Sequence, residues 1–287
     1  MKNASGGVSP PATLTVNITT DQTNYNLFTA AGSPGTAKTV VVNISSGVYI
    51  RASSTGNNAF DEGNGWATGT TITINNSGNI IGMGGAGGAG GNQLYTDLPV
   101  AGNNGSAGGT ALRLTAPTSI ANASGAIFGG GGGGGGGSGC YARGDDGESS
   151  VLVTSGGGGG GGGRGANTAS AGSGGTATNI DPAQKASGAA GTAGSFSGTG
   201  VKGEGGNLAF YWYYNRTLSG ADGGNGGEFG AAGNNATDPS LTSYSGVDFS
   251  YKTLATGGAA GRSVNTNGQS LTWLSGNVPS RVKGPQY

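Results

Sequence analysis

The chain has 287 residues and a formal net charge of zero, charged residues make up only 9% of it, and histidine is absent. Such a balance offers no basic surface for nucleic acid or for an anionic membrane. Without histidine, neither a Ser-His-Asp nor a Cys-His nucleophile can form, and the common histidine-containing zinc sites are excluded. We therefore expect no catalytic residues, no metal and no cofactor, and hence a protein that is not an enzyme.

Cysteine content and the N-terminal segment bear on where the protein is made. Cys140 is the single cysteine, so an internal disulfide framework is excluded and we expect the thiol to have no functional role. Residues 1–10 lack the basic and apolar regions of a secretion signal, and nowhere do eighteen apolar residues follow one another. We expect synthesis in the cytoplasm and no membrane insertion.

The first part of the chain has the composition of a small β domain. Short runs of β-branched and aromatic residues, separated by Gly, Ser, Asn and Pro, predict strands at 13–19, 25–30, 39–44, 48–52 and 70–75. The last of them belongs to a repeat, because residues 74–82 recur with one residue inserted as 120–129. Both copies lead directly into glycine repeats, so each predicts a β-turn-β unit that feeds a glycine segment. We assign residues 1–82 to this domain.

Glycine accounts for 68 residues and is spaced regularly. Residues 129–137 and 156–163 are uninterrupted glycine, and in the other glycine-rich stretches glycine returns every third residue. Three residues per turn is the repeat of the polyproline-II helix, which has no internal hydrogen bonds. Because glycine has no Cβ atom, such helices can approach closely enough to bond laterally. Nine prolines are too few for collagen, so we predict a single chain folded into a polyglycine-II sandwich over residues 83–261.

The lengths of these segments predict which ends the connections occupy. We expect glycine helices at 84–91, 102–109, 129–139, 156–163, 172–175, 188–194, 198–206, 220–226, 227–233 and 257–261. If successive helices alternate in direction, one end of the bundle receives the inserts 92–101, 140–155, 176–187, 207–219 and 234–256. The connections at 110–128, 164–171, around 196 and around 227 then lie at the opposite end.

Aromatic residues are concentrated in those five inserts. Loop aromatics on a rigid scaffold give a large contact area for little loss of entropy, as in antibody paratopes. The candidate binding residues are Tyr95, Tyr141, Phe210, Tyr211, Trp212, Tyr213, Tyr214, Tyr244, Phe249 and Tyr251, with Arg143 and Asp145 as charged contacts. The alternative is that these rings pack on one another and on the bundle to hold the loops. Arg143-Gly144-Asp145 is interpreted as a turn.

The tail, residues 262–287, has the pattern of β-strands rather than of glycine helix. Trp273 is expected to anchor it by packing against the N-terminal β domain. The predicted fold is thus non-α, with a small N-terminal β domain, a polyglycine-II sandwich carrying long distal loops, and C-terminal β-strands.

Taken together, the β-turn-β lead-in, the glycine repeats and the five inserts resemble the receptor-binding adhesins at the distal tip of the long tail fibres of T-even-type bacteriophages. The resemblance covers about residues 70–261. It implies that the inserts bind an outer-membrane protein or lipopolysaccharide of a Gram-negative host and so determine host range. It further implies that residues 1 to about 80 attach to a trimeric fibre protein, which places the chain in the virion, at the tip of the tail fibre.

Two other functions stay open at this point. A polysaccharide-degrading tip protein would need paired carboxylates, and the acids in 145–148 and in 234–256 could supply them, although neighbouring loop acids more often only solvate a surface. A structural, ice-binding-like glycine protein would carry regular Thr or Ala on an exposed face, and the long aromatic inserts argue against it. Residues 198–203 match a dinucleotide fingerprint only by chance, because no strand precedes them and no helix follows.

Overall fold

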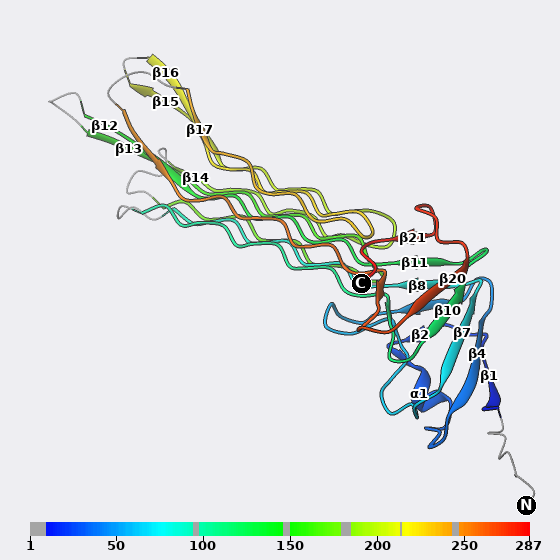
Figure 1. Ribbon diagram of the computed structural model, residues 1–287. Coiled ribbons are helices and arrows are strands. Elements are labelled where there is room, and N and C mark those ends of the chain that lie inside the picture. The colour runs from blue at the N-terminus through cyan, green and yellow to red at the C-terminus, as the bar shows by residue number, and fades with distance from the viewer. Residues whose placement is uncertain (1–9, 94–97, 146–149, 179–184, 213, 243–246) are drawn as a thin grey trace, which may run out of the picture.

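The fold is described from a computed structural model that covers residues 10–93, 98–145, 150–178, 185–212, 214–242 and 247–287. Two bodies lie end to end in Figure 1: a stack of short parallel strands, which we call the β stack, and a bundle of long glycine segments that extends from it. Among the described residues the longest α-helix is α1 (Leu27–Ala30), and no helix could cross a membrane. The non-α fold class is therefore confirmed.

Three parallel sheets form the β stack. Each of the first four turns of the chain adds a strand to all three sheets, and the last turn adds a strand to the first and second sheets. The first sheet contains β1 (Ala12–Ile18), β4 (Lys38–Ile44), β7 (Thr71–Asn76), β10 (Thr118–Ala121) and β20 (Leu271–Ser275). The second contains β2 (Gln22–Thr23), β5 (Tyr49–Arg51), β8 (Asn79–Ile81), β11 (Ala126–Phe128) and β21 (Val282–Lys283). The third contains β3 (Tyr25–Asn26), β6 (Phe60–Asp61), β9 (Leu112–Arg113) and β19 (Val264–Asn265).

Alternation along the strands explains the core of the stack. Val42 pairs with Ile74, Ile74 with Ile120, and Ile120 with Trp273, so a column of apolar side chains crosses the first sheet. The aliphatic members of this column are buried, and Trp273 packs against them, as the sequence predicted. Burying each side chain of this kind contributes roughly 1.5–3 kcal/mol.

The two copies of the internal repeat occupy equivalent places in the stack. β7 and β8 pair with β10 and β11, respectively, and the first glycine segments follow directly after β8 and β11. The predicted β-turn-β units are therefore confirmed. Along the chain, the glycine segments are inserted between a strand of the second sheet and the next strand of the third sheet, after β8 and again after β11. The stack is therefore built from strands within 10–82, 112–128 and 264–287. The division of the chain at 82 and 262 stays a prediction.

One predicted strand is wrong in part. The extended segment expected over 25–30 ends at Asn26, and α1 follows. The side chain of Asn26 accepts a hydrogen bond from the backbone N–H of Thr29 at 2.9 Å and so caps the first turn of α1. Local capping of this kind outweighs the β propensity of the aromatic and β-branched residues nearby.

Lateral hydrogen bonds hold the glycine bundle together, with the predicted three-residue repeat. Segment 129–137 donates to segments 102–109, 156–164 and 231–234, and it accepts from segments 84–91, 224–227 and 258–261. Gly131, Gly134 and Gly137, for example, donate to Arg164, Gly161 and Gly158 at 2.8 Å each. The predicted lateral bonding is therefore confirmed.

Position in the bundle explains why two segments are pure glycine. Segment 156–163, like 129–137, is bonded on all sides and fully buried, because it contacts segments 84–91, 129–137, 172–175, 188–194, 198–206 and 220–227. Peripheral segments such as 102–108 have glycine only at every third position and expose Asn103, Asn104, Ser106 and Ala107. A Cβ atom on an inward residue would collide with a neighbouring backbone, whereas a Cβ atom on an outward residue points to solvent.

An aromatic cluster joins the near end of the bundle to the outer face of the second sheet. We call it the junction cluster and define it as Tyr49, Phe128, Phe196 and Phe229. Phe196 lies 5.7 Å from Tyr49 and 5.8 Å from Phe229, and Phe229 lies 5.1 Å from Phe128, between ring centroids. The guanidinium of Arg164 lies over Phe229 at 4.7 Å. Some glycine segments end in turns at this end of the bundle and do not continue into a strand of the stack. The aromatic side chains attach these turns to the stack.

Candidate functional site

The five inserts come together at the far end of the bundle, as we predicted from glycine segments that alternate in direction (Figure 1). We call this region the hairpin end. One sheet contains β14 (Lys185–Ala186), β13 (Ser150–Ser155), β12 (Cys140–Asp145) and β18 (Val247–Tyr251), in this order. Another contains β15 (Asn207–Trp212), β16 (Tyr214–Ser219) and β17 (Ser240–Leu241). Inserts that we expected as loops therefore contain hairpins, whose pairing satisfies backbone groups that long loops would leave to water.

A small apolar core underlies the two sheets. Cys140, Ala142, Val153 and Leu218 are buried in it, and Leu208, Leu241 and Phe249 pack against it. The Sγ of Cys140 lies 3.7 Å from the carbonyl oxygen of Ser219 on the neighbouring sheet. Burial raises the pKa of this thiol to about 12. Cys140 is thus a packing residue between the sheets.

The described candidate residues differ in exposure. Arg143 is exposed, Tyr251 is 43% exposed, and Tyr141 and Phe249 are half-buried. The rings of Phe249 and Tyr251 lie 5.6 Å apart, so the outer ring rests on one that packs against the core. Phe249 therefore lies where a ring would hold the hairpins together, which is the alternative role considered from the sequence. Tyr251 lies where a ring could contact a partner.

The Arg143-Gly144-Asp145 segment is not the turn that the sequence predicted. All of it belongs to β12, where Arg143 pairs with Leu152 on one side and with Asp248 on the other. The tripeptide is extended because β13 pairs with all three residues and β18 pairs with Arg143 and Gly144 from the other side. Arg143 and Asp248 are both exposed and directly opposite each other, which places charges of both signs on the outer surface of this sheet.

Several candidates are placed only by their backbone or lie outside the described residues. Phe210 pairs with Arg216, Tyr211 with Asn215, and Trp212 with Tyr214, at the tip of the hairpin β15–β16. Asp145 pairs with Ser150 at the tip of the hairpin β12–β13. Tyr95, Tyr213 and Tyr244 lie outside the described residues.

Sequence reasoning missed two apolar residues at this end. Leu98 is 67% exposed and Val100 is 44% exposed, both in the insert 92–101. The insert is held in place by Gln93, whose backbone bridges to Pro99 and to Ala177. The available signal was the pair of apolar side chains on either side of Pro99, which attention to aromatic residues overlooked.

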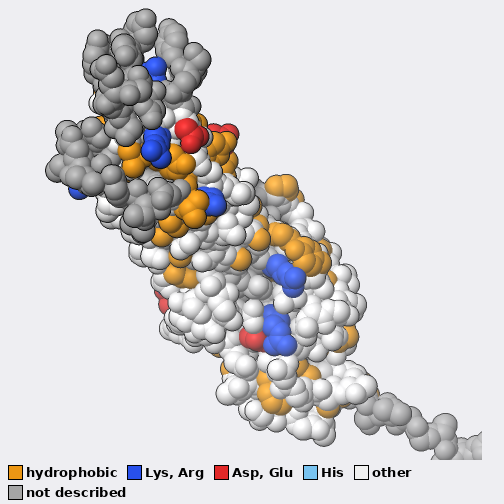
Figure 2. Space-filling view, turned by 90° about the vertical axis from the view of Figure 1, so that its left-hand side faces the viewer, with side chains coloured by type: hydrophobic (Ala, Val, Ile, Leu, Met, Phe, Trp, Pro, Cys, Tyr) orange, Lys and Arg blue, Asp and Glu red, His pale blue; other side chains and the backbone are white. Residues whose placement is uncertain are grey.

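Outside the hairpin end, the surface seen in Figure 2 is formed mainly by backbone and uncharged polar side chains. Figure 2 shows a long body that is mostly white between the two grey ends, where backbone and small polar side chains face the solvent, with scattered hydrophobic and charged groups. Within the described ranges, no group of three or more His, Cys, Asp or Glu side chains is placed to hold a metal ion.

The chain is similar to one known protein family and to one solved structure. Residues 13–286 match the family described as phage tail fibre adhesin Gp38. No curated protein sequence matches it. Among solved structures, a chain of the gp37-gp38 adhesin tip complex from the long tail fibre of bacteriophage S16 is similar, with a TM-score of 0.50 and 22% identity over 95% of this chain and 82% of that chain. At this identity the likeness concerns the fold.

Proposed function

Because the chain belongs to the phage tail fibre adhesin Gp38 family, we propose that its hairpin end binds a receptor on the bacterial surface and so determines host range. The family confirms the resemblance seen in the sequence, and as a tail fibre adhesin the protein is part of the phage tail. The receptor class that we propose is an outer-membrane protein or lipopolysaccharide. The location that we propose within the tail is the distal tip.

One observation carries this proposal: five inserts far apart in the sequence come together at the end of the bundle opposite β1 (Figure 1). A scaffold without interior side chains has no use for these inserts in its own stability, and the core beneath them fixes their relative positions. Exposed apolar groups, Leu98, Val100 and Tyr251, and the exposed charges of Arg143 and Asp248 all belong to inserts at this end. Apolar anchors with a polar rim are the usual composition of a protein-binding surface.

The adhesin role that we propose is non-enzymatic. The family is described as an adhesin, which supports this role, whereas glycoside hydrolysis usually needs a pair of carboxylates. Asp248, one of the acids considered for such a pair, lies opposite Arg143 on the next strand. Incubation with host surface polysaccharide should therefore release no new reducing ends, and their release would contradict a purely adhesive role.

A second part of the proposal concerns attachment to the fibre. We propose that a trimeric tail fibre protein binds the first turn of the β stack, β1 to β3, because these strands form one edge of each of the three sheets. That edge lies far from the hairpin end in Figure 1, and its inward side chains Leu14 and Val16 are only half-buried. The similar structure is itself a gp37-gp38 complex, which supports a tail fibre protein as the partner.

Separate experiments address the two ends. Replacing residues 210–214 by alanine should abolish adsorption to host cells and leave the thermal midpoint nearly unchanged, with Val201→Ala on the exposed side of the bundle as the matched control. Unchanged adsorption by the folded variant would contradict the proposed site. For the mount, Leu14→Lys should prevent copurification with the fibre protein, whereas Leu274→Lys, an exposed position on the opposite edge strand β20, should not.

A further inference from the structure

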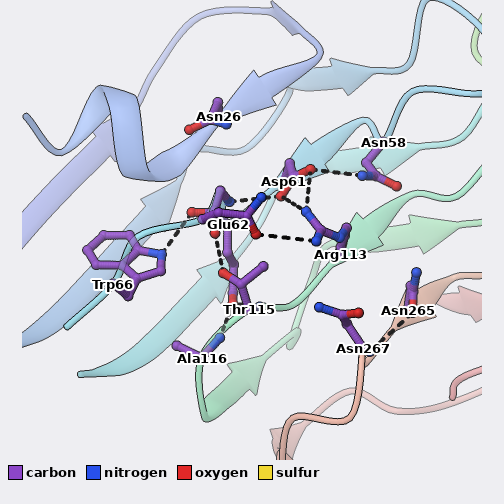
Figure 3. Close-up of polar contacts among 12 residues, drawn as sticks. Asn26, Asn58, Asp61, Glu62, Trp66, Arg113, Thr115, Ala116, Asn265 and Asn267 are labelled. Carbon is purple, nitrogen blue, oxygen red and sulfur yellow. Dashed lines mark hydrogen bonds and ion pairs between the residues drawn. The ribbon is translucent and has the colours of Figure 1, made fainter. Parts of the chain in front are cut away.

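A buried carboxyl group, that of Glu62, lies inside the β stack (Figure 3). Glu62 follows β6 directly and has no exposed surface. Its Oε2 accepts hydrogen bonds from the backbone N–H groups of Thr115 and Ala116, at 2.6 and 3.1 Å. Its Oε1 lies 2.5 Å from the hydroxyl oxygen of Thr118. The side chain thus ties the loop after β6 to the segment that leads into β10.

The Thr118 hydroxyl lies within hydrogen-bonding distance of two oxygen atoms. Its oxygen lies 2.5 Å from Glu62 Oε1 and also 2.9 Å from the carbonyl oxygen of Ala116. A hydroxyl has one hydrogen and cannot donate to both. If Oε1 of Glu62 carries a proton, it donates to Thr118, and Thr118 donates to Ala116. The Oε2 atom then acts as the carbonyl oxygen that accepts both backbone N–H groups, so every contact is satisfied by the neutral acid.

The charged groups around Glu62 also favour the neutral form. Asp61 precedes it on β6 and is a like charge. Arg113, on the adjacent strand β9, is directed to Asp61 at 3.2 Å and to the side chain of Asn64 at 3.3 Å. No ion pair with Glu62 is present among the described residues, and α1, which packs against the same loop, carries no charged side chain. A charge on Glu62 would therefore be buried without a counter-ion.

We propose that Glu62 is a neutral, proton-donating acid in the folded protein and that it works as a pH-sensitive latch in the β stack. Losing the proton reverses the Thr118 hydroxyl and deprives the Ala116 carbonyl of its donor. Burial is the main cause that raises the pKa of Glu62, to about 7, with Asp61 adding to the rise and the three hydrogen-bond donors opposing it. The latch therefore opens within the physiological range.

The loop beside Glu62 transmits this change to the first turn of the stack. The backbone carbonyl of Glu62 accepts from the Trp66 indole at 2.9 Å and from the backbone N–H of Phe28 in α1 at 3.0 Å. The rings of Phe28 and Trp66 meet edge to face at 5.1 Å. Since α1 follows β3 directly, loosening this loop loosens the edge where we place the fibre partner. The proton-binding claim itself does not depend on that partner.

The sign of the pH dependence follows from the raised pKa. Below about pH 4.5 the carboxyl is neutral in both the folded and the unfolded chain, so its full contribution to stability is present. As the pH rises toward 7, the unfolded chain loses its proton while the folded chain keeps it, and the folding equilibrium constant falls about tenfold per pH unit. Above pH 7 both states are ionised and the contribution is lost.

The composition of the chain makes this proposal easy to test. There is no histidine, and the glutamates are Glu62, Glu148, Glu204 and Glu228. In the full chain labelled with carbon-13 at the glutamate carboxyl, one signal, that of Glu62, should titrate near pH 7. Glu62→Gln should remove that signal, and Glu228→Gln, an exposed position, should leave it. Ordinary titration of every signal would overturn the proposal.

A second measurement remains decisive if Glu62→Gln is poorly soluble for spectroscopy. Wild-type stability against denaturant should fall between pH 5 and 7, and Glu62→Gln should be nearly flat over the same interval, because its amide reproduces the hydrogen bonds of the neutral acid. Thr118→Ser should behave as wild type, since it keeps the hydroxyl. Glu228→Gln, which retains any contribution of the terminal amine, should also keep the wild-type slope. A wild-type stability that does not change from pH 5 to 7 would refute the latch.

Discussion

Gly132 faces the backbone carbonyl of Gly258 so closely that a Cβ atom on Gly132 would lie 2.0 Å from the Gly258 oxygen. The two segments are joined laterally, since the N–H of Gly258 donates to Gly133 at 2.7 Å. Because both partners are backbone, neither can turn aside as a side chain would. The contact explains the uninterrupted glycine of residues 129–137.

We expect Gly132→Ala to destabilise the bundle severely, by about 4 kcal/mol or more. The matched control is Gly198→Ala, because a Cβ atom at Gly198 meets nothing within 4 Å, and its effect should stay within about 0.5 kcal/mol. Thermal or denaturant unfolding of the two variants gives the comparison. Equal stability of the two would mean that the segments are not closely packed.

Removing the junction cluster should separate the bundle from the stack without unfolding either. Phe229 is 5% exposed, so Phe229→Ala should cost about 3 kcal/mol, whereas Phe196 is 40% exposed and Phe196→Ala should cost about 1 kcal/mol. Small-angle scattering of the double variant should show a broader distribution of overall dimensions. An unchanged scattering profile would show that the continuous chain connections alone fix the bundle.

The thiol of Cys140 should be unreactive in the folded protein. With its pKa raised to about 12 by burial, almost no thiolate exists at pH 8, and the reagent has no access. A colorimetric disulfide reagent should label the native chain at least a hundredfold more slowly than the chain in denaturant. Rapid labelling of the native protein would show that the two hairpin sheets separate readily.

Phe249 and Tyr251 should differ in what their loss affects. Phe249→Ala removes a ring from the core of the hairpin end and should lower stability by about 2 kcal/mol, with Phe249→Leu recovering most of the loss. Tyr251→Ala should change stability by less than about 0.5 kcal/mol, since the ring is 43% exposed. Adsorption to host cells, measured per folded molecule, should fall for Tyr251→Ala and stay near wild type for Phe249→Leu.

Much of the architecture could be predicted because glycine spacing is a local property with a direct steric meaning. The glycine at every third position indicated the lateral lattice, segment lengths indicated which connections share an end, and the repeat of 74–82 at 120–129 indicated equivalent strands. Two predictions were wrong because two local structures compete for the same residues and the residue pattern does not decide between them. Asn26 caps a helix where a strand was predicted, and β12 extends through the predicted turn at 143–145.

By itself, the sequence determined that glycine segments without interior side chains carry five inserts to one end, because the absence of a Cβ atom is a property of each residue. Only the tertiary structure decided which segments lie at the centre, that Phe249 and Cys140 pack inward, and that Glu62 meets Thr118 across 56 positions of the chain. Those relationships depend on which distant backbones become neighbours. Burial and hydrogen bonding, which give each side chain its role, exist only once the neighbours are in place.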